Sequence, residues 1–112
     1  QVFTVAPVVL IDNKASADYT VIEINGRDRS ELLFDLTRTL FGLNLTIGSA
    51  HIATFGEKAV DVFYVRDLFG HKVEHPAKIR QIQTKLVEVL AAGNPPPKKP
   101  GAKPAKVAQA AE

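Results

Sequence analysis

The spacing of apolar residues switches twice along the chain from strand-like to helix-like, and this order restricts the fold more than any other feature. Alternating or β-branched runs predict strands, and apolar spacings of three and four predict helices. Four runs are strand-like, at 7–13, 19–25, 46–55 and 58–65. Two stretches are helix-like: one carries Leu33, Leu36 and Leu40 with Leu32 beside them, and the other begins at Pro76 and carries Ile79, Ile82, Leu86, Val89 and Leu90. The predicted order is strand, strand, helix, strand, strand, helix.

Short connections join the strands in pairs. The polar segment "KASAD" (14–18) joins the first two strands, and Gly56-Glu57 between the other two is a Gly-first, two-residue turn of type II′. Each pair is therefore expected to form an antiparallel hairpin. Gly42 is the expected left-handed stop of the first helix, and Pro76 suits the first position of the second.

Each predicted helix has a one-sided apolar stripe, so both are expected on one face of a four-stranded antiparallel sheet, as an α+β two-layer sandwich. The order fits the split-βαβ, ferredoxin-like plan, except that no strand follows the second helix. We expect the N-terminal strand to replace that missing last strand, at the edge beside strand 19–25. The predicted organisation is a linker at 1–8, one domain at 9–93 and a disordered Pro-, Lys- and Ala-rich tail at 94–112.

Composition and charge exclude several classes of partner. The 112 residues, 46% of them hydrophobic, suffice for one modest core. Four lysines follow Gly93, which leaves ten Lys and Arg against eleven Asp and Glu in residues 1 to 92. The domain thus lacks the basic surface of a nucleic-acid-binding protein. There is no cysteine, no membrane-length apolar run and no basic signal-peptide start, so we expect a cytoplasmic protein with no membrane partner.

The loop "NGRDRS" (25–30) leads from a central strand into a helix start, where free backbone N–H groups favour an anion. Asp28 or Ser30 can cap the helix, while Arg27 and Arg29 can donate charged hydrogen bonds to a carboxylate or phosphate. The alternative is a capped turn with solvated arginines, and spacing alone favours that alternative.

The histidines carry less weight as site residues. His51 lies in the middle of a predicted strand, where a structural role is expected. His71, Glu74 and His75 lie close together in "HKVEH", but Pro76 argues against the shared helix that histidine ligands four residues apart need. We therefore expect no metal site.

Two carboxylates and two phenylalanines complete the candidates. Glu23 and Asp61 are expected to point together to the open face of the sheet as solvated side chains. Phe34 and Phe41 widen the apolar face of the first helix beyond what one small sheet needs, which suggests a partner subunit. No serine lies in a nucleophile motif, so no catalytic residue is expected.

Residues 20–67, and above all the run "SAHIATFGEKAVDVFYV", resemble an ACT domain. The resemblance covers about residues 9 to 92 and is greatest to the C-terminal ACT domain of the bifunctional uridylyltransferase and uridylyl-removing enzymes, which modify the nitrogen signal protein P-II. It implies a regulatory, glutamine-sensing module that is not itself an enzyme and holds no cofactor. The parent enzyme implied is a nucleotidyltransferase and phosphodiesterase with a divalent metal. The start at Gln1 and the lack of methionine also favour a piece of a longer protein.

ACT domains bind an amino acid between the loop entering the first helix and a neighbouring ACT domain or subunit, which contributes the start of its second family strand. The resemblance thus implies a ligand site at Asn25, Gly26, Arg27, Asp28, Arg29, Ser30, Glu31 and Leu32, completed by Thr46, Ile47 and Gly48 of the neighbour.

The helix start departs from the family pattern. Most relatives have Asp-Arg-Pro-Gly-Leu-Leu where this chain has Asp-Arg-Ser-Glu-Leu-Leu at 28–33. Ser30 and Glu31 suit the helix as a cap and as a negative group at its positive end. The Glu31 charge opposes a ligand carboxylate, so we expect weakened or absent glutamine binding. The main alternative function is a dimerisation or interaction domain that needs no ligand. A phosphate-gripping enzyme and an RNA-binding sheet fit less well, because their motifs are missing.

Overall fold

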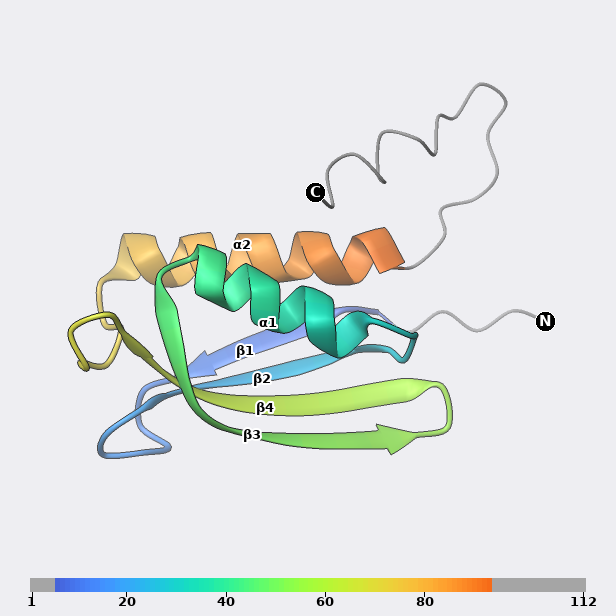
Figure 1. Cartoon of the computed structure of the whole chain (residues 1–112), viewed down its shortest axis with the longest axis horizontal. Coiled ribbons are helices and arrows are strands. Elements are labelled where there is room, and N and C mark those ends of the chain that lie inside the picture. The colour runs from blue at the N-terminus through green and yellow to red at the C-terminus, as the bar shows by residue number, and fades with distance from the viewer. Residues whose placement is uncertain (1–5, 94–112) are drawn as a thin grey trace, which may run out of the picture.

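The six predicted elements are present in the predicted order in a computed structural model, which describes residues 6–93 (Figure 1). They are β1 (Val8–Asp12), β2 (Thr20–Arg27), α1 (Leu32–Gly42), β3 (Leu45–Phe55), β4 (Lys58–Asp67) and α2 (Pro76–Gly93). Strand β1 begins one residue before the predicted domain start. The predicted tail lies outside the described residues. Within them, no helix is long and apolar enough to cross a membrane.

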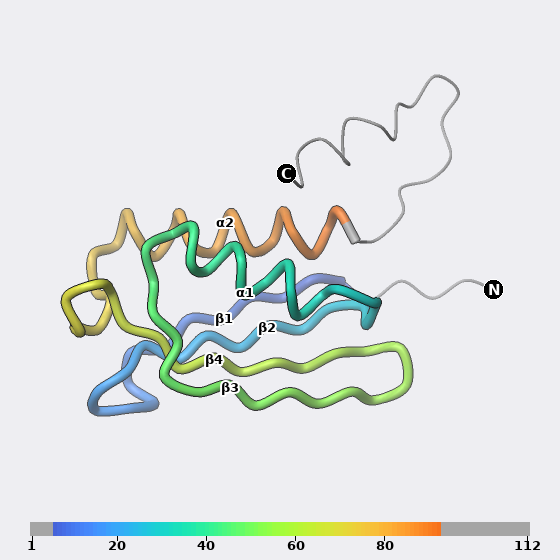
Figure 2. The backbone as a smooth tube through the Cα atoms, in the orientation of Figure 1, coloured from blue at the N-terminus to red at the C-terminus, as the bar shows by residue number. Residues whose placement is uncertain are grey.

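The sheet has the order β1-β2-β4-β3, and every pair of neighbours is antiparallel. Strand β1 pairs with β2, with Val9 opposite Ile24, so it takes the edge position predicted for it. Both helices lie on one face of the sheet, as Figures 1 and 2 show. The predicted ferredoxin-like sandwich, including the substitution of the last strand by the first, is confirmed.

The core forms between the helices and the sides of the strands that face them. Its most buried large side chains include Ile22 and Phe63 from the sheet and Leu36, Leu40 and Ile82 from the helices. These positions keep the periods of two and of three to four that defined the elements in the sequence. We call the opposite side of the sheet the open face.

Details of α1 differ from the prediction. Its buried stripe is Leu32, Leu36 and Leu40, one residue every four, while Leu33 is half-exposed. Gly42 is the last helical residue and not a left-handed stop. The left-handed position is Asn44 at φ 65°, and its N–H donates to the carbonyl of Phe41 at 3.0 Å. Asparagine tolerates this conformation, so no glycine is needed there.

The two ends of the sheet carry different loops. One end, which we call the loop corner, consists of residues 25–32 and the turn 55–58 between β3 and β4. The other, which we call the far pole, consists of residues 43–48 and 67–78. In the turn between β3 and β4, Gly56 has φ 63° and Glu57 has no positive φ, which is the pattern of the predicted type II′ turn.

Candidate functional site

The loop corner is fixed to the hairpin turn of β3 and β4. The N–H of Asp28 donates to the carbonyl of Glu57 at 2.7 Å. The N–H of Leu32 donates back to the carbonyl of Arg29 at 3.1 Å, which closes the tight turn before α1. The start of α1 is therefore positioned by backbone bonds on both sides of the loop.

Glu31, immediately before α1, has a left-handed backbone, with φ 70° and ψ 3°. No side chain caps the helix, so the expectation that Asp28 or Ser30 does so is wrong. A side chain at this conformation costs about 1–2 kcal/mol compared with glycine, because Cβ approaches the following carbonyl. The glycine that the family resemblance implies at this position would therefore suit the backbone.

The two arginines of the loop differ in their contacts. Arg29 pairs with Asp35 through its Nη2 at 2.9 Å, and its Nη1 lies 3.5 Å from the carbonyl of Ser30. Its Nε is buried and has no hydrogen-bond partner. Arg27 is exposed, and within residues 6–93 its side chain has no hydrogen bond or ion pair. One cation is therefore held in place while the other is available to a ligand.

Three of the predicted site residues have packing roles. The amide of Asn25 donates to the carboxylate of Glu23 at 2.9 Å, on the open face. Gly26 leaves room for Leu90 of α2, whose Cδ2 lies 2.7 Å from where a Cβ would stand. Leu32 belongs to the core. The candidates that can still face a ligand are thus Arg27, Asp28, Arg29, Ser30 and Glu31.

Thr46, Ile47 and Gly48 lie at the far pole, away from the loop corner. The sheet register places Arg27 opposite Lys58 and Lys58 opposite Phe55. Gly48 is seven residues from Phe55 along β3, or about 23 Å at 3.3 Å per residue. A single copy therefore does not bring the two predicted halves of the site together.

Gly48 has a packing role of its own. The ring of Tyr19 lies 2.4 Å from where a Cβ would stand at this position. Tyr19 in turn meets the ring of Tyr64 edge-on, with centroids 6.2 Å apart, and lies under the guanidinium of Arg66 at 4.0 Å. His51 meets the other side of this group through Tyr64. His51 thus has an aromatic packing role on the open face.

Asp61 does not lie on the open face, contrary to the prediction. It pairs with Ile24 and alternates with Ala59 and Phe63, so its side chain belongs to the helix-facing side, where only 2% of the residue is exposed. Its Oδ1 has no hydrogen-bond partner. The prediction gave the charge of Asp61 more weight than the strand period, and the period was the correct guide.

The environment of Asp61 opposes its ionisation. Burial, as the largest cause, and the charge of Asp28 raise its pKa above the ordinary value, while the backbone N–H of Ala53 lowers it. The register places Asp61 on β4 three residues from Lys58 of the loop corner, and its side chain faces the helix side. The candidate site thus contains a carboxylate that sequence reasoning assigned elsewhere. The alternation of Ala59, Phe63 and Val65 around it was the signal that could have found it.

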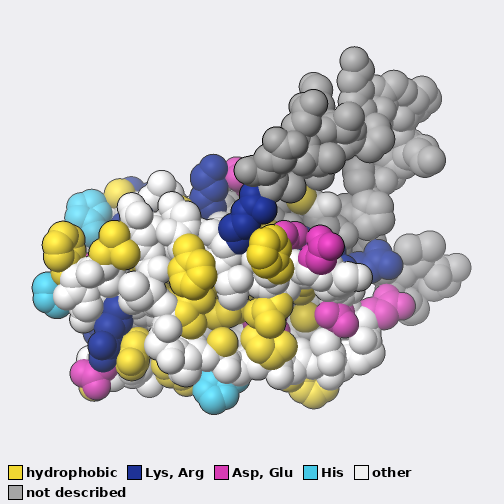
Figure 3. Space-filling view, viewed as in Figure 1, with side chains coloured by type: hydrophobic (Ala, Val, Ile, Leu, Met, Phe, Trp, Pro, Cys, Tyr) yellow, Lys and Arg dark blue, Asp and Glu magenta, His cyan; other side chains and the backbone are white. Residues whose placement is uncertain are grey.

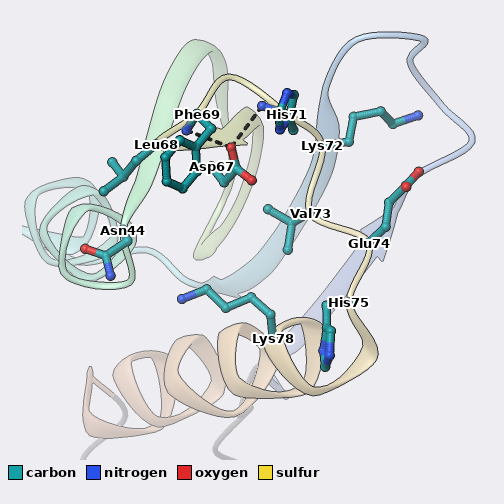
Figure 4. A pocket seen from close by; sticks show the side chains of 10 residues that line it. All are labelled: Asn44, Asp67, Leu68, Phe69, His71, Lys72, Val73, Glu74, His75 and Lys78. Carbon is teal, nitrogen blue, oxygen red and sulfur yellow. Dashed lines mark hydrogen bonds between the residues drawn. The ribbon is translucent and has the colours of Figure 1, made fainter.

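A hollow of about 520 Å³ lies at the far pole, between α2 and the segment that follows β4 (Figure 4). The carboxylate of Asp67 accepts the N–H groups of Phe69 and His71, both at 2.9 Å. The N–H of His71 is the largest cause of the lowered pKa of Asp67. Lys78 extends from α2 toward the side where Asn44 lies (Figure 4).

This hollow contains the "HKVEH" segment. Among residues 6–93, no group of three or more His, Cys, Asp or Glu side chains is arranged to hold a metal ion. His75 instead accepts the N–H of Ala77 through Nδ1 at 3.2 Å, at the start of α2. His75 thus has a local role at the start of α2, while Lys72 and Val73 bond to residues 13–20 and hold the segment against the loop between β1 and β2.

An apolar surface extends from α1 to β3, formed by Leu33, Phe34, Phe41 and Ile52. Phe34 and Phe41 are 59% and 60% exposed. Ile52 pairs with Asp61 and so faces the helix side, yet it is 47% exposed because neither helix covers that part of β3. Figure 3 shows hydrophobic side chains gathered over α1 and the neighbouring strands. We call these four residues the α1–β3 apolar surface.

Comparisons with known proteins identify relatives. A sequence model described as "ACR family N-terminal ACT domain" matches residues 15–92. The chain is similar to the bifunctional uridylyltransferase/uridylyl-removing enzyme of Azospirillum brasilense, at 60% identity over 91 residues. It is also similar to the enzyme of the same name from Zymomonas mobilis, at 55% identity over 85 residues. These matches cover 81% and 76% of the chain but only 10% and 9% of the relatives, so the chain spans about a tenth of their length.

A solved structure supports the fold alone. The crystal structure of an unknown protein from Galdieria sulphuraria matches with a TM-score of 0.51 at 20% sequence identity. The match covers 62% of this chain and 37% of that one.

The resemblance to the uridylyltransferase/uridylyl-removing enzymes is confirmed, while the position of the domain within such an enzyme stays a prediction. With the family match covering nearly all of the folded residues, the chain belongs to the ACT-domain family.

Proposed function

We propose that the chain is the regulatory, glutamine-sensing ACT domain of an enzyme that adds uridylyl groups to P-II and removes them in the control of nitrogen metabolism. In this proposal the domain performs no chemistry, and the catalytic centres with their divalent metal belong to other parts of a cytoplasmic parent enzyme. The names of the relatives and the family membership support it.

The observation that carries the proposal is the position of the two site halves at opposite ends of β3. Among the strands of residues 6–93, this strand pairs only with β4 and is an edge of the sheet. If a second β3 pairs with it antiparallel, the start of one strand lies beside the end of the other. The neighbour's Thr46 and Ile47 then approach the loop corner, and a complete site forms only between two ACT domains.

The same arrangement supports a second ACT domain as the partner. Pairing along β3 would cover Ile52 and bring the α1–β3 apolar surface of each domain against the other, as in a homodimer or a pair of ACT domains. Exposed apolar surfaces of this kind commonly mark protein interfaces. This surface also supports the second candidate function, a dimerisation domain that needs no ligand.

Calorimetric titration with glutamine, combined with sedimentation of the same samples, separates the two candidates. The sensing proposal predicts saturable glutamine binding and a dimer that glutamine strengthens. A dimer that forms equally well with and without every common amino acid would replace it with the interaction domain.

A further inference from the structure

Two buried side-chain atoms within residues 6–93 lack a hydrogen-bond partner, one in the loop corner and one on β4 beside it. They are Nε of Arg29, a donor, and Oδ1 of Asp61, an acceptor. Buried polar atoms are paired in nearly all proteins, because leaving one unpaired is unfavourable. Two such atoms of opposite character at one end of the sheet therefore call for an explanation.

The fold brings the two residues to one end of the sheet. Asp61 lies three residues along β4 from Lys58, which pairs with Arg27, and the N–H of Asp28 bonds to the carbonyl of Glu57 in the same turn. The remaining nitrogens of Arg29 are directed to Asp35 and Ser30, which leaves Nε as the unused donor. The carboxylates of Asp28 and Asp61 thus belong to neighbouring parts of the loop and the sheet, and neither takes part in the ion pairs Arg29–Asp35 and Lys85–Glu88.

The hollow at the far pole offers a contrast. Asp67, one of its lining residues, already accepts two backbone N–H groups. Within residues 6–93, none of the buried side-chain atoms without a hydrogen-bond partner belongs to this hollow. The unpaired buried groups therefore indicate the loop corner and the part of β4 beside it.

We propose that Asp61 accepts the ammonium group of the bound amino acid and that Nε of Arg29 donates to its carboxylate. An α-amino acid is a zwitterion, and it supplies the cation and the anion that these two atoms lack. Asp28 adds a second negative charge on the ammonium side. The inference rests on the proposed function, because it names how that site recognises its ligand.

The ligand must displace part of the loop to reach these atoms, since neither atom reaches solvent. The contact to be released is the bond from the N–H of Asp28 to the carbonyl of Glu57. Ligand entry would thus be coupled to a movement of the loop relative to the β3–β4 turn. A regulatory domain needs such a coupling between binding and conformation.

The test uses the whole 112-residue chain and three probes. Glutamine carries both charged groups, glutaramate lacks the ammonium group, and 4-aminobutanamide lacks the carboxylate. We expect the unmodified chain to bind glutamine about 10- to 100-fold more tightly than either analogue, as for charged hydrogen bonds. Asp61→Asn should remove the preference over glutaramate, and Arg29→Lys the preference over 4-aminobutanamide. Glu88→Gln, on the exposed side of α2, is the matched control and should change nothing.

The outcomes separate the inference from the function on which it rests. Glutamine binding with equal affinity for glutaramate, or an Asp61→Asn variant that keeps the full preference, would overturn the role of Asp61 and leave the sensor intact. If none of the common amino acids binds, both the role of Asp61 and the sensing function are overturned. The analogue comparison on the unmodified chain keeps the test decisive even if a variant fails to fold.

Discussion

At the scale of single residues, Glu31 shows how a favourable side chain can occupy an unfavourable backbone. A glutamate at a helix start suits the dipole, and this preference concealed the left-handed conformation that the structure gives it. The family resemblance implied a glycine at this position, and the prediction explained that glycine as room for a ligand. The backbone requirement could not be derived from one chain, because nothing in the local pattern fixes φ.

We predict that Glu31→Gly stabilises the domain by about 0.5–1 kcal/mol. The free energy gained by relief of the left-handed strain exceeds the entropic cost of ordering the more flexible glycine on folding. Thermal unfolding should show a melting temperature higher by about 3–6 °C for a domain of this size. Asn44→Gly is the control, because asparagine already tolerates the left-handed region and should gain less. An unchanged or lower melting temperature for Glu31→Gly would contradict the assigned conformation.

The same position bears on ligand affinity. The variant with both Ser30→Pro and Glu31→Gly should bind glutamine more tightly than the unmodified chain, because it removes a negative charge near the expected ligand carboxylate. At a separation of about 5 Å the gain ranges from about fourfold in a water-like dielectric to about 200-fold at an effective dielectric of 20. Calorimetry on both proteins measures it. Equal tight affinities would show that Glu31 does not oppose the ligand.

Asp61 makes a pH-dependent contribution to the free energy of unfolding, which can be measured without any ligand. Its pKa is raised in the folded state, so folding is opposed once the unfolded chain ionises this group. The resulting loss of stability is absent below the ordinary pKa of 3.8 and grows as the pH rises toward the raised pKa of the folded state. It is fully present above that raised pKa. Asp28 is the charged group that adds to it.

Asp61→Asn should therefore be more stable than the unmodified chain at pH 7, by about 1 kcal/mol, and lose this advantage near pH 3.5. Urea unfolding at the two pH values measures the difference. Asp18→Asn, at an exposed loop position, should change stability little at either pH. A destabilised Asp61→Asn at pH 7 would mean that the carboxylate has an unseen partner in the folded domain.

At the scale of elements, the sequence predicted the order, the pairing and the permuted edge strand, because apolar periods and turn residues are local signals. It misplaced the start of the buried stripe on α1, since Leu32 and Leu33 are adjacent and only contact with the sheet decides between them. It also misplaced Asp61, where a charged residue interrupts an otherwise regular buried row. Tertiary packing decided the position of both residues. For Asp61, the strand period was a better guide to that position than the residue type.

The contact between Gly48 and Tyr19 gives a prediction at this scale. Gly48→Ala should destabilise the domain by about 1–3 kcal/mol, because the ring cannot move aside without losing its contacts with Tyr64 and Arg66. Combining it with Tyr19→Ala should remove most of that additional effect. Chemical denaturation of the two single variants and the double variant forms the cycle. Additive effects would show that the close approach is unimportant.

At the scale of the whole molecule, the separation of the two site halves is the property that the sequence could not show. The residues at 25–31 and 46–48 are close in sequence, yet α1 and the length of β3 place them at opposite ends of the sheet. Family resemblance implied that a neighbour completes the site. The topology separates the two predicted halves within one copy, because β2 and β3 run parallel and α1 must return the chain to the far pole before β3 begins.

The last prediction concerns assembly through the edge strand. Replacing Phe34 and Ile52 together by lysine should weaken self-association of the chain at least tenfold, because two charges would enter the α1–β3 apolar surface on each side of the pair. Sedimentation velocity over a concentration series measures it. Leu10→Lys, at an exposed position on the opposite edge strand, is the control and should leave association unchanged. If Leu10→Lys disrupts association while the double variant does not, the domains pair through β1 or the open face, and the loop corner of one domain would then lie away from the β3 start of its neighbour.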